Sequence, residues 1–69
     1  MLLGKITKWD EDRGIGFIGR DDGKPDVFVR VSAFTNGGAS LARGTRVSFD
    51  IIEDARTGKT RAANVKVIA

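Results

Sequence analysis

Residues 13–18, with the sequence RGIGFI, bring together a cation, two glycines and large apolar side chains. If this run is a β-strand, Arg13, Ile15 and Phe17 share one face, because side chains alternate between the two faces of a strand. The glycines leave room for a flat group to approach the backbone between the large side chains. A face that is cationic, apolar and open is what a stacked nucleobase beside a phosphate requires. The run therefore predicts a base-stacking surface.

A second run, VFVRV at residues 27–31, repeats this arrangement, with Phe28 and Arg30 on one face and the valines on the other. Trp9 falls on the outward register of an earlier strand, so we expect Trp9, Phe17 and Phe28 to form one platform. The alternative is that the rings only cover one another as a surface apolar cluster. Stacking is favoured by the flanking cations, which are Lys5, Lys8, Arg13 and Arg30.

Two nucleotide-binding motifs match the sequence in letters but not in context. Residues 14–19 fit G-x-G-x-x-G, but a turn follows them, and that motif needs a helix whose N-terminus holds the pyrophosphate. Residues 57–60, TGKT, end like a phosphate-binding loop, but Glu53 stands where the first glycine belongs. We therefore expect neither motif to bind a nucleotide.

Composition argues against an enzyme. The chain has 69 residues, no cysteine and no histidine, so disulfides and thiolate or imidazole metal sites are excluded. A general base would have to be a lysine or a carboxylate, and the carboxylates cluster in solvated turns. Asp10 and Asp12 could share a divalent ion, but an acidic turn explains them as well. We expect no catalytic residue, metal, cofactor or small-molecule substrate.

The net charge and the chain ends set further expectations. Twelve basic and nine acidic residues give a formal charge of +3, a mild bias toward an anionic partner. The N-terminus has no signal-peptide core and the chain no bilayer-spanning run, so we expect a cytoplasmic protein without a membrane partner. We expect one domain over residues 1–69 and a monomer, although exposed edge strands would permit a weak dimer.

No window of ten or more residues shows the apolar spacing of a helix. Alternating patterns and turn residues instead predict five strands, near residues 5–9, 14–19, 26–31, 45–51 and 60–68. Five strands with tight turns and one long loop indicate an all-β fold, a small and highly curved antiparallel barrel.

The same patterns predict which side chains face the core. On the first strand Ile6 points inward, while Lys5, Thr7 and Trp9 point outward. The rows expected inside are Val47, Phe49 and Ile51 on the fourth strand and Ala63, Val65 and Val67 on the fifth, with Arg46, Ser48 and Asp50 facing water. In the long loop, Ser32 is expected to cap a helical turn and Phe34 to plug the barrel end, while residues 36–38 keep the rest loose.

The runs at residues 13–18 and 26–34 resemble the two nucleic-acid motifs of bacterial cold-shock domains, K-G-F-G-F-I and D-V-F-V-H-F-S-A-I. The similarity extends from Gly4 to Val67. It implies an OB-type Greek-key barrel of five strands that binds single-stranded RNA or DNA. Such a protein would act as an RNA chaperone or as a regulator of transcription or translation, without nucleotide hydrolysis. The candidate binding residues are Lys5, Lys8, Trp9, Arg13, Ile15, Phe17, Phe28, Arg30 and Arg61.

The chain departs from this family pattern at several aromatic positions. Lys8 takes the place of the family's tryptophan, Ile15 and Val31 replace phenylalanines, Arg30 replaces histidine, and the long loop offers Gly38 or Ala39 where an aromatic is usual. Each lost stack removes about 1–3 kcal/mol of binding. Arg30 can recover part of this by stacking on a base. The alternative hypothesis is a protein-interaction OB module with weakened or lost nucleic-acid binding.

Overall fold

A computed structural model of the chain describes residues 1–35 and 41–68. It contains five strands, β1 (Leu2–Asp10), β2 (Ile15–Arg20), β3 (Val27–Arg30), β4 (Arg46–Glu53) and β5 (Thr60–Val67), and one short 3₁₀ helix, η1 (Val31–Ala33). All five predicted strands are present. β1 and β4 are longer than predicted, while β2 and β3 each begin one residue later, at Ile15 and Val27.

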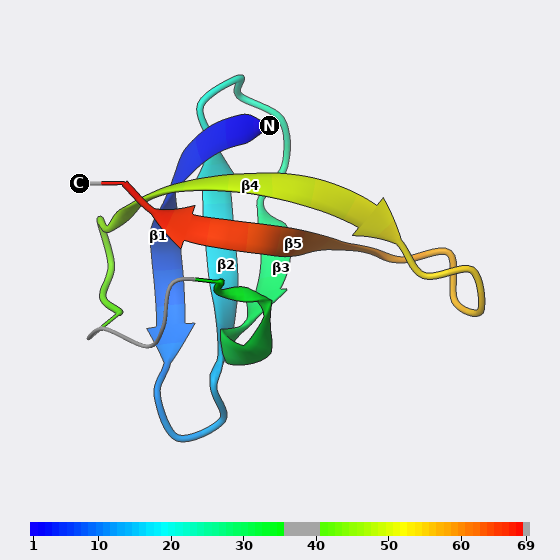
Figure 1. Ribbon diagram of the computed structural model, residues 1–69, viewed down its shortest axis with the longest axis horizontal. Helices are drawn as coiled ribbons and strands as arrows, with labels where there is room; N and C mark the ends of the chain where they lie inside the picture. The colour runs from blue at the N-terminus through cyan, green and yellow to red at the C-terminus, as the bar shows by residue number, and fades with distance from the viewer. Residues whose placement is uncertain (36–40, 69) are drawn as a thin grey trace.

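The strands form one antiparallel sheet in the order β3-β2-β1-β4-β5. β4 and β5 cross over β1, β2 and β3 at a steep angle, and the β4–β5 hairpin extends well beyond β3 (Figure 1). The sheet curls until β5 lies beside η1, where Phe34 bridges Val65 and the Thr35 amide donates to the Val65 carbonyl at 2.9 Å. This nearly closed barrel confirms the predicted all-β, five-stranded OB-type fold.

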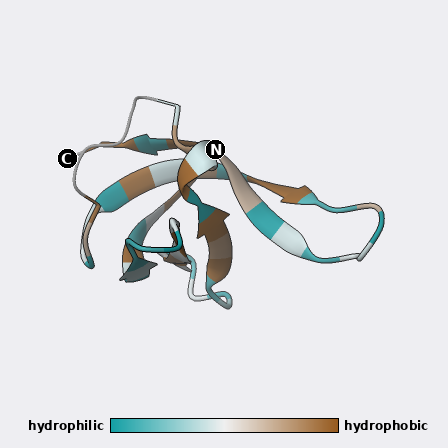
Figure 2. Ribbon diagram, turned by 90° about the horizontal axis from the view of Figure 1, so that it is seen from below, coloured by the Kyte–Doolittle hydropathy of each residue, from teal (hydrophilic) through white to brown (hydrophobic). Residues whose placement is uncertain are grey.

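Apolar segments alternate with hydrophilic ones along the strands (Figure 2). All five strands contribute buried apolar side chains to the core. The predicted inward positions Ile6, Val47 and Phe49 are all at most 1% exposed. Ser48 was expected in water but is 4% exposed. Its cross-strand neighbours are Leu3 and Lys66, whose longer side chains flank it on the same face of the sheet. The buried apolar set is Ile6, Ile18, Val27, Val29, Leu41, Val47, Phe49, Ala62 and Val65.

The apolar row of β5 differs from the prediction at one position. Ala62 is buried, whereas Ala63 is only half-buried. The β4–β5 register shifts between Ser48 and Asp50, and Asn64 adopts a positive φ of 50°. Such an irregularity adds a residue to one strand and reverses its alternation. Counting every second residue back from Val65 therefore predicted Ala63 as the buried alanine, whereas the structure buries Ala62.

The segment after β3 forms a helical turn, as expected, but Ser32 does not cap it. Arg30 is the N-cap residue of η1, and no side chain caps this turn. Phe34 is half-buried against the core, which agrees with its predicted role as a plug. The predictions for residues 36–40, including Gly38 and Ala39, lie outside the described residues.

Candidate nucleic-acid interface

A bulge at Thr7 decides which side chains of β1 reach the outer face of the sheet. Before it Ile6 pairs with Ile18, and after it Lys8 pairs with Phe17 and Trp9 with Gly16. The extra residue reverses the alternation, because a shift of one position moves every following side chain to the other face. Lys8 therefore lies outside, beside Phe17. The prediction that Trp9 shares the outward face of Lys5 is wrong.

Trp9 lies at the inner edge of the barrel. Its ring packs edge-on against Phe34, with centroids 5.9 Å apart, and it contacts the core. A Cβ atom on Gly16 would lie 2.6 Å from Trp9 Cε3, so the indole occupies the room that this glycine leaves. The flat group that lies against the backbone of Gly16 is therefore the protein's own Trp9 indole. Trp9 is half-buried and still lines an open groove that it shares with Ile15, Phe17 and Leu41.

Five of the predicted residues do share the outer face of β1, β2 and β3. Lys8, Phe17 and Phe28 form one row across the three strands, and Asp10, Ile15 and Arg30 form the next. Phe17 is 39% exposed, and its ring meets Phe28 edge-on with centroids 5.9 Å apart. We call this surface the platform, made of Lys8, Ile15, Phe17, Phe28 and Arg30.

The platform carries cations at both ends of its ring pair. The Arg30 guanidinium carbon lies 5.7 Å from the centroid of the Phe28 ring, within the range of a cation–π contact. Within the described part of the chain, neither Lys8 nor Arg30 forms an ion pair. Both charges therefore remain available to an anionic group that approaches the rings.

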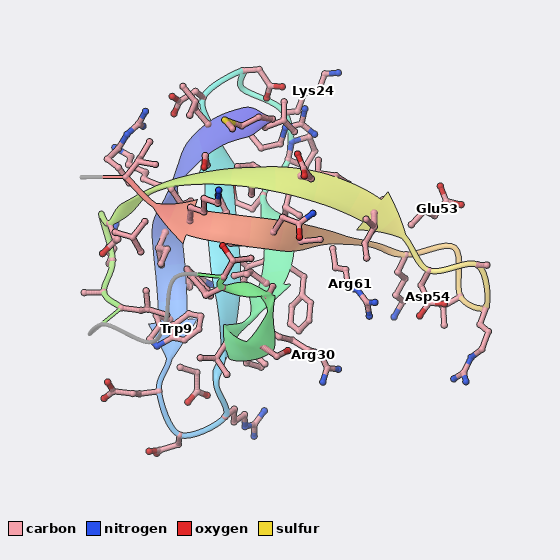
Figure 3. All side chains as sticks on the ribbon, viewed as in Figure 1. Trp9, Lys24, Arg30, Glu53, Asp54 and Arg61 are labelled. Atoms are coloured by element: carbon pink, nitrogen blue, oxygen red, sulfur yellow. The ribbon has the colours of Figure 1, made fainter. Side chains whose placement is uncertain are left out.

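The β4–β5 hairpin adds a second wall to this surface. Phe17, Phe28 and Arg30 line a groove of ≈ 450 Å³ together with hairpin residues that include Lys59, Thr60 and Arg61. Arg61 was predicted as a site residue, and the structure brings it to the platform from a distant part of the sequence. Figure 3 shows Arg30 and Arg61 projecting from β3 and β5 on the same side of η1. We call this space the platform groove.

Two predicted residues lie away from the platform. Arg13 belongs to the turn between β1 and β2, because Gly14 takes a positive φ of 65° and β2 begins only at Ile15. Its Nε atom lies 3.8 Å from Asp10 Oδ2. The prediction that Arg13 shares a strand face with Ile15 is therefore wrong. Lys5 is exposed opposite Gly19, on the other side of the Thr7 bulge.

Sequence reasoning missed the hairpin contribution of Lys59 and Thr60 and the place of Asp10 in the second row. The only signal for the hairpin residues was the TGKT run, which fails as a phosphate loop because it lacks the first glycine. Its cation and hydroxyl nevertheless line the platform groove. Nothing local in the sequence shows that this turn curls back toward β3.

Comparison with known proteins decides the family. The sequence model of the 'Cold-shock' DNA-binding domain matches residues 2–68. The chain belongs to the cold-shock domain family. It is 41% identical to "Cold shock protein CspA" of Rhizobium meliloti over 96% of this chain and 97% of the relative. It is 46% identical to "Cold shock-like protein CspE" of Escherichia coli over 93% of this chain and 91% of the relative.

A solved structure gives the same fold for this cold-shock domain. The chain superposes on the solved structure of "drosophila Unr CSD456" with a TM-score of 0.82 at 18% sequence identity. The match covers 99% of this chain and 26% of the other. Cold-shock domain proteins bind nucleic acid and are not enzymes, so the chain is a nucleic-acid-binding protein. In residues 1–35 and 41–68, no helix is long and apolar enough to cross a bilayer, and no side-chain cluster is suited to a metal ion.

Proposed function

We propose that this cold-shock domain binds single-stranded RNA or DNA on the platform. Unpaired bases stack on Phe17 and Phe28, and Lys8 and Arg30 contact the adjoining phosphates. The observation that carries the proposal is the adjacent pair of accessible rings, 5.9 Å apart, with a cation on either side. Duplex nucleic acid does not offer its base faces, so the platform selects single strands.

Selective binding of this kind makes the protein an RNA chaperone. A protein that binds the single-stranded form and not the duplex shifts the folding equilibrium of RNA by mass action, without nucleotide hydrolysis. Weak hairpins melt first, because their free energy of pairing is smallest. Regulation of transcription or translation follows where such a hairpin controls either process.

The platform predicts only modest affinity. Ile15 lies in the second row, beside Arg30, and Lys8 ends the first row. Neither provides a ring, and each ring that is absent costs about 1–3 kcal/mol of stacking. Arg30 lies over Phe28 in the free protein, so its guanidinium must move aside or stack on the incoming base. Trp9 fills the space beneath Gly16, and its accessible part lines the groove beside Ile15 and Phe17, where a bound strand can contact it.

A titration of labelled oligo-dT, oligo-U and a matched duplex, followed by fluorescence anisotropy at two salt concentrations, tests the proposal. We expect saturable binding of the single strands, weak binding of the duplex and a negative log–log dependence of affinity on salt. Equal binding of duplex and single strand would contradict stacking. The alternative, an interaction module that has lost nucleic-acid affinity, predicts no saturable binding to any of the three.

A further inference from the structure

The platform groove holds a carboxylate among its cations. Beside the rings of Phe17 and Phe28, its lining among the described residues consists of Arg30, Asp54, Thr57, Lys59, Thr60 and Arg61. Asp54 is the one acidic side chain in this set. A carboxylate repels the phosphates that the cations attract. Asp54 therefore works against binding of the nucleic-acid backbone and is suited to a different contact.

The turn of the β4–β5 hairpin holds Asp54 in a defined position. Its amide donates to the Lys59 carbonyl at 2.8 Å, and its carbonyl accepts from the Gly58 amide at 2.7 Å. Its side-chain Oδ1 accepts from the Arg56 amide at 2.8 Å, a hydrogen bond of the Asx-turn type. The side chain is half-buried. The carboxylate is therefore oriented by the turn before any ligand binds.

The second oxygen of this carboxylate, Oδ2, is available. It makes no hydrogen bond with any described residue, and neither Lys59 nor Arg61 comes within ion-pair distance of it. Asp54 and Arg61 project from the same side of the hairpin, whereas the neighbouring Glu53 projects from the opposite side (Figure 3). Asp54 thus presents an acceptor with a full charge to the groove that contains the two rings.

Stacking leaves the edges of a base free to contact this acceptor. A base that lies on Phe28 uses its face, and its Watson–Crick edge points away from its sugar and phosphate. With the phosphates at Lys8 and Arg30, that edge meets the hairpin wall. Cytosine has an amino group there, N4, which donates to a carboxylate, whereas uracil and thymine have the carbonyl oxygen O4, which a carboxylate repels.

We propose that Asp54 contacts the Watson–Crick edge of a base stacked on the platform and makes this domain prefer cytosine to uracil and thymine. The inference rests on the proposed function of the platform and adds base selectivity to it. The rings and cations supply affinity for any single strand, and Asp54 distinguishes the bases. Asp54 is therefore a specificity-determining residue.

The test compares oligo-dC with oligo-dU of equal length by fluorescence anisotropy, at neutral pH and one salt concentration. These strands share the same sugar and lack the thymine methyl group, so they differ only at the base edge that Asp54 is proposed to contact. For each protein the ratio of the two dissociation constants is taken. A general change in charge affects both strands alike and cancels in this ratio.

Two substitutions of Asp54 change the acceptor in different ways. Asp54→Asn can still accept from the Arg56 amide and turns an NH₂ donor toward the groove. Asp54→Ser retains a weaker form of the same turn and offers no charged acceptor. Glu53→Gln is the matched control, because it removes the same charge from the adjacent residue, which does not line the platform groove. Thermal unfolding checks that each variant is folded.

We expect wild type to bind oligo-dC about three- to tenfold more tightly than oligo-dU, the effect of one hydrogen bond. Asp54→Ser should abolish this preference. Asp54→Asn should reverse it, because its NH₂ group donates to O4 of uracil. Glu53→Gln should keep the wild-type ratio, even if both strands bind it more tightly.

Equal affinity of wild type for the two strands would overturn the role of Asp54, and so would a wild-type ratio in a folded Asp54 variant. Either result would leave the platform intact, because both strands would still bind. If Asp54→Asn does not fold, the ratio measured for Asp54→Ser decides. Failure of wild type to bind either strand would overturn the proposed function and this inference with it.

Discussion

Lys8 lies directly opposite Phe17 across the β1–β2 ladder, on the outer face of the barrel. The bulge at Thr7 creates this relationship, because it turns the Trp9 side chain to the inner edge of the barrel and the Lys8 side chain to the outer face. The first row of the platform is therefore an ammonium followed by two rings. Lys8 stands where the resemblance to the cold-shock family places a tryptophan, and its charge can reach a phosphate but cannot stack.

The first prediction restores that ring. Lys8→Trp extends the row of Phe17 and Phe28 by one stacking position, so affinity for oligo-dT at moderate salt should rise by about 1–3 kcal/mol. The lost ammonium should make the salt slope less negative by about 0.7. Anisotropy titrations at several salt concentrations separate the two effects. Lys24→Trp, in the distant β2–β3 turn, serves as the control for non-specific effects of a new indole.

Weaker binding of a folded Lys8→Trp variant at every salt concentration would contradict the first prediction. It would mean that a side chain at position 8 does not lie beside the bases that Phe17 binds.

The second prediction concerns Gly16, whose backbone lies against β1. An added Cβ would lie 2.3 Å from the Lys8 carbonyl oxygen and 2.6 Å from Trp9 Cε3. The first of these atoms belongs to a paired strand and cannot move aside. Gly16→Ala should therefore lower the free energy of unfolding by about 1–3 kcal/mol, the usual cost of overpacking. Urea unfolding followed by Trp9 emission measures it, and an unchanged midpoint would show that the indole does not lie over this glycine.

The fold was predictable because strand alternation is a local property of the sequence. Val47 and Phe49 were correctly placed in the core, and Phe17, Phe28 and Arg30 on one outer face. Alternation fails wherever a strand gains a residue. Because of the bulge at Thr7, alternation predicted the wrong face for Trp9. Because of the irregularity at Asn64, it predicted Ala63 in the core in place of Ala62.

The contribution of the hairpin was not predictable from local pattern. Residues 59–61 reach the platform only because the sheet curls until β5 meets η1. This is a property of barrel closure, and no spacing between Phe28 and Arg61 in the sequence shows it. Arg30 and Arg61 are 31 residues apart in the chain (residues 30 and 61), and they still line the same two grooves, one of which is the platform groove.

The third prediction is a loss of stability in acid. Arg46 Nη1 and Nη2 donate to the Asp21 carboxylate at 2.9 Å and 2.8 Å, which ties the β2–β3 turn to the start of β4. These hydrogen bonds hold the pKa of Asp21 below its usual 3.8 and raise the pKa of Arg46. A carboxyl group whose pKa is lower in the folded state stabilises the fold at neutral pH, and this contribution is lost as the pH falls through the folded-state pKa.

Asp21→Asn and Arg46→Gln should each lower the urea midpoint at pH 7, and the double variant should lose less than the sum. The gap between wild type and Asp21→Asn should close as the pH falls below about 4. A gap that stays constant from neutral to strongly acid pH would show that the charge of Asp21 does not contribute to stability.

The most direct test of the account replaces the two platform rings. Phe17→Ala and Phe28→Ala should each weaken binding of oligo-dT by about 1–3 kcal/mol, while circular dichroism shows the barrel intact, because neither ring belongs to the buried core. Lys24→Ala, in the remote turn, is the matched control and should bind like wild type. Unchanged affinity in both phenylalanine variants would contradict the claim that this cold-shock domain holds single strands by stacking bases on Phe17 and Phe28.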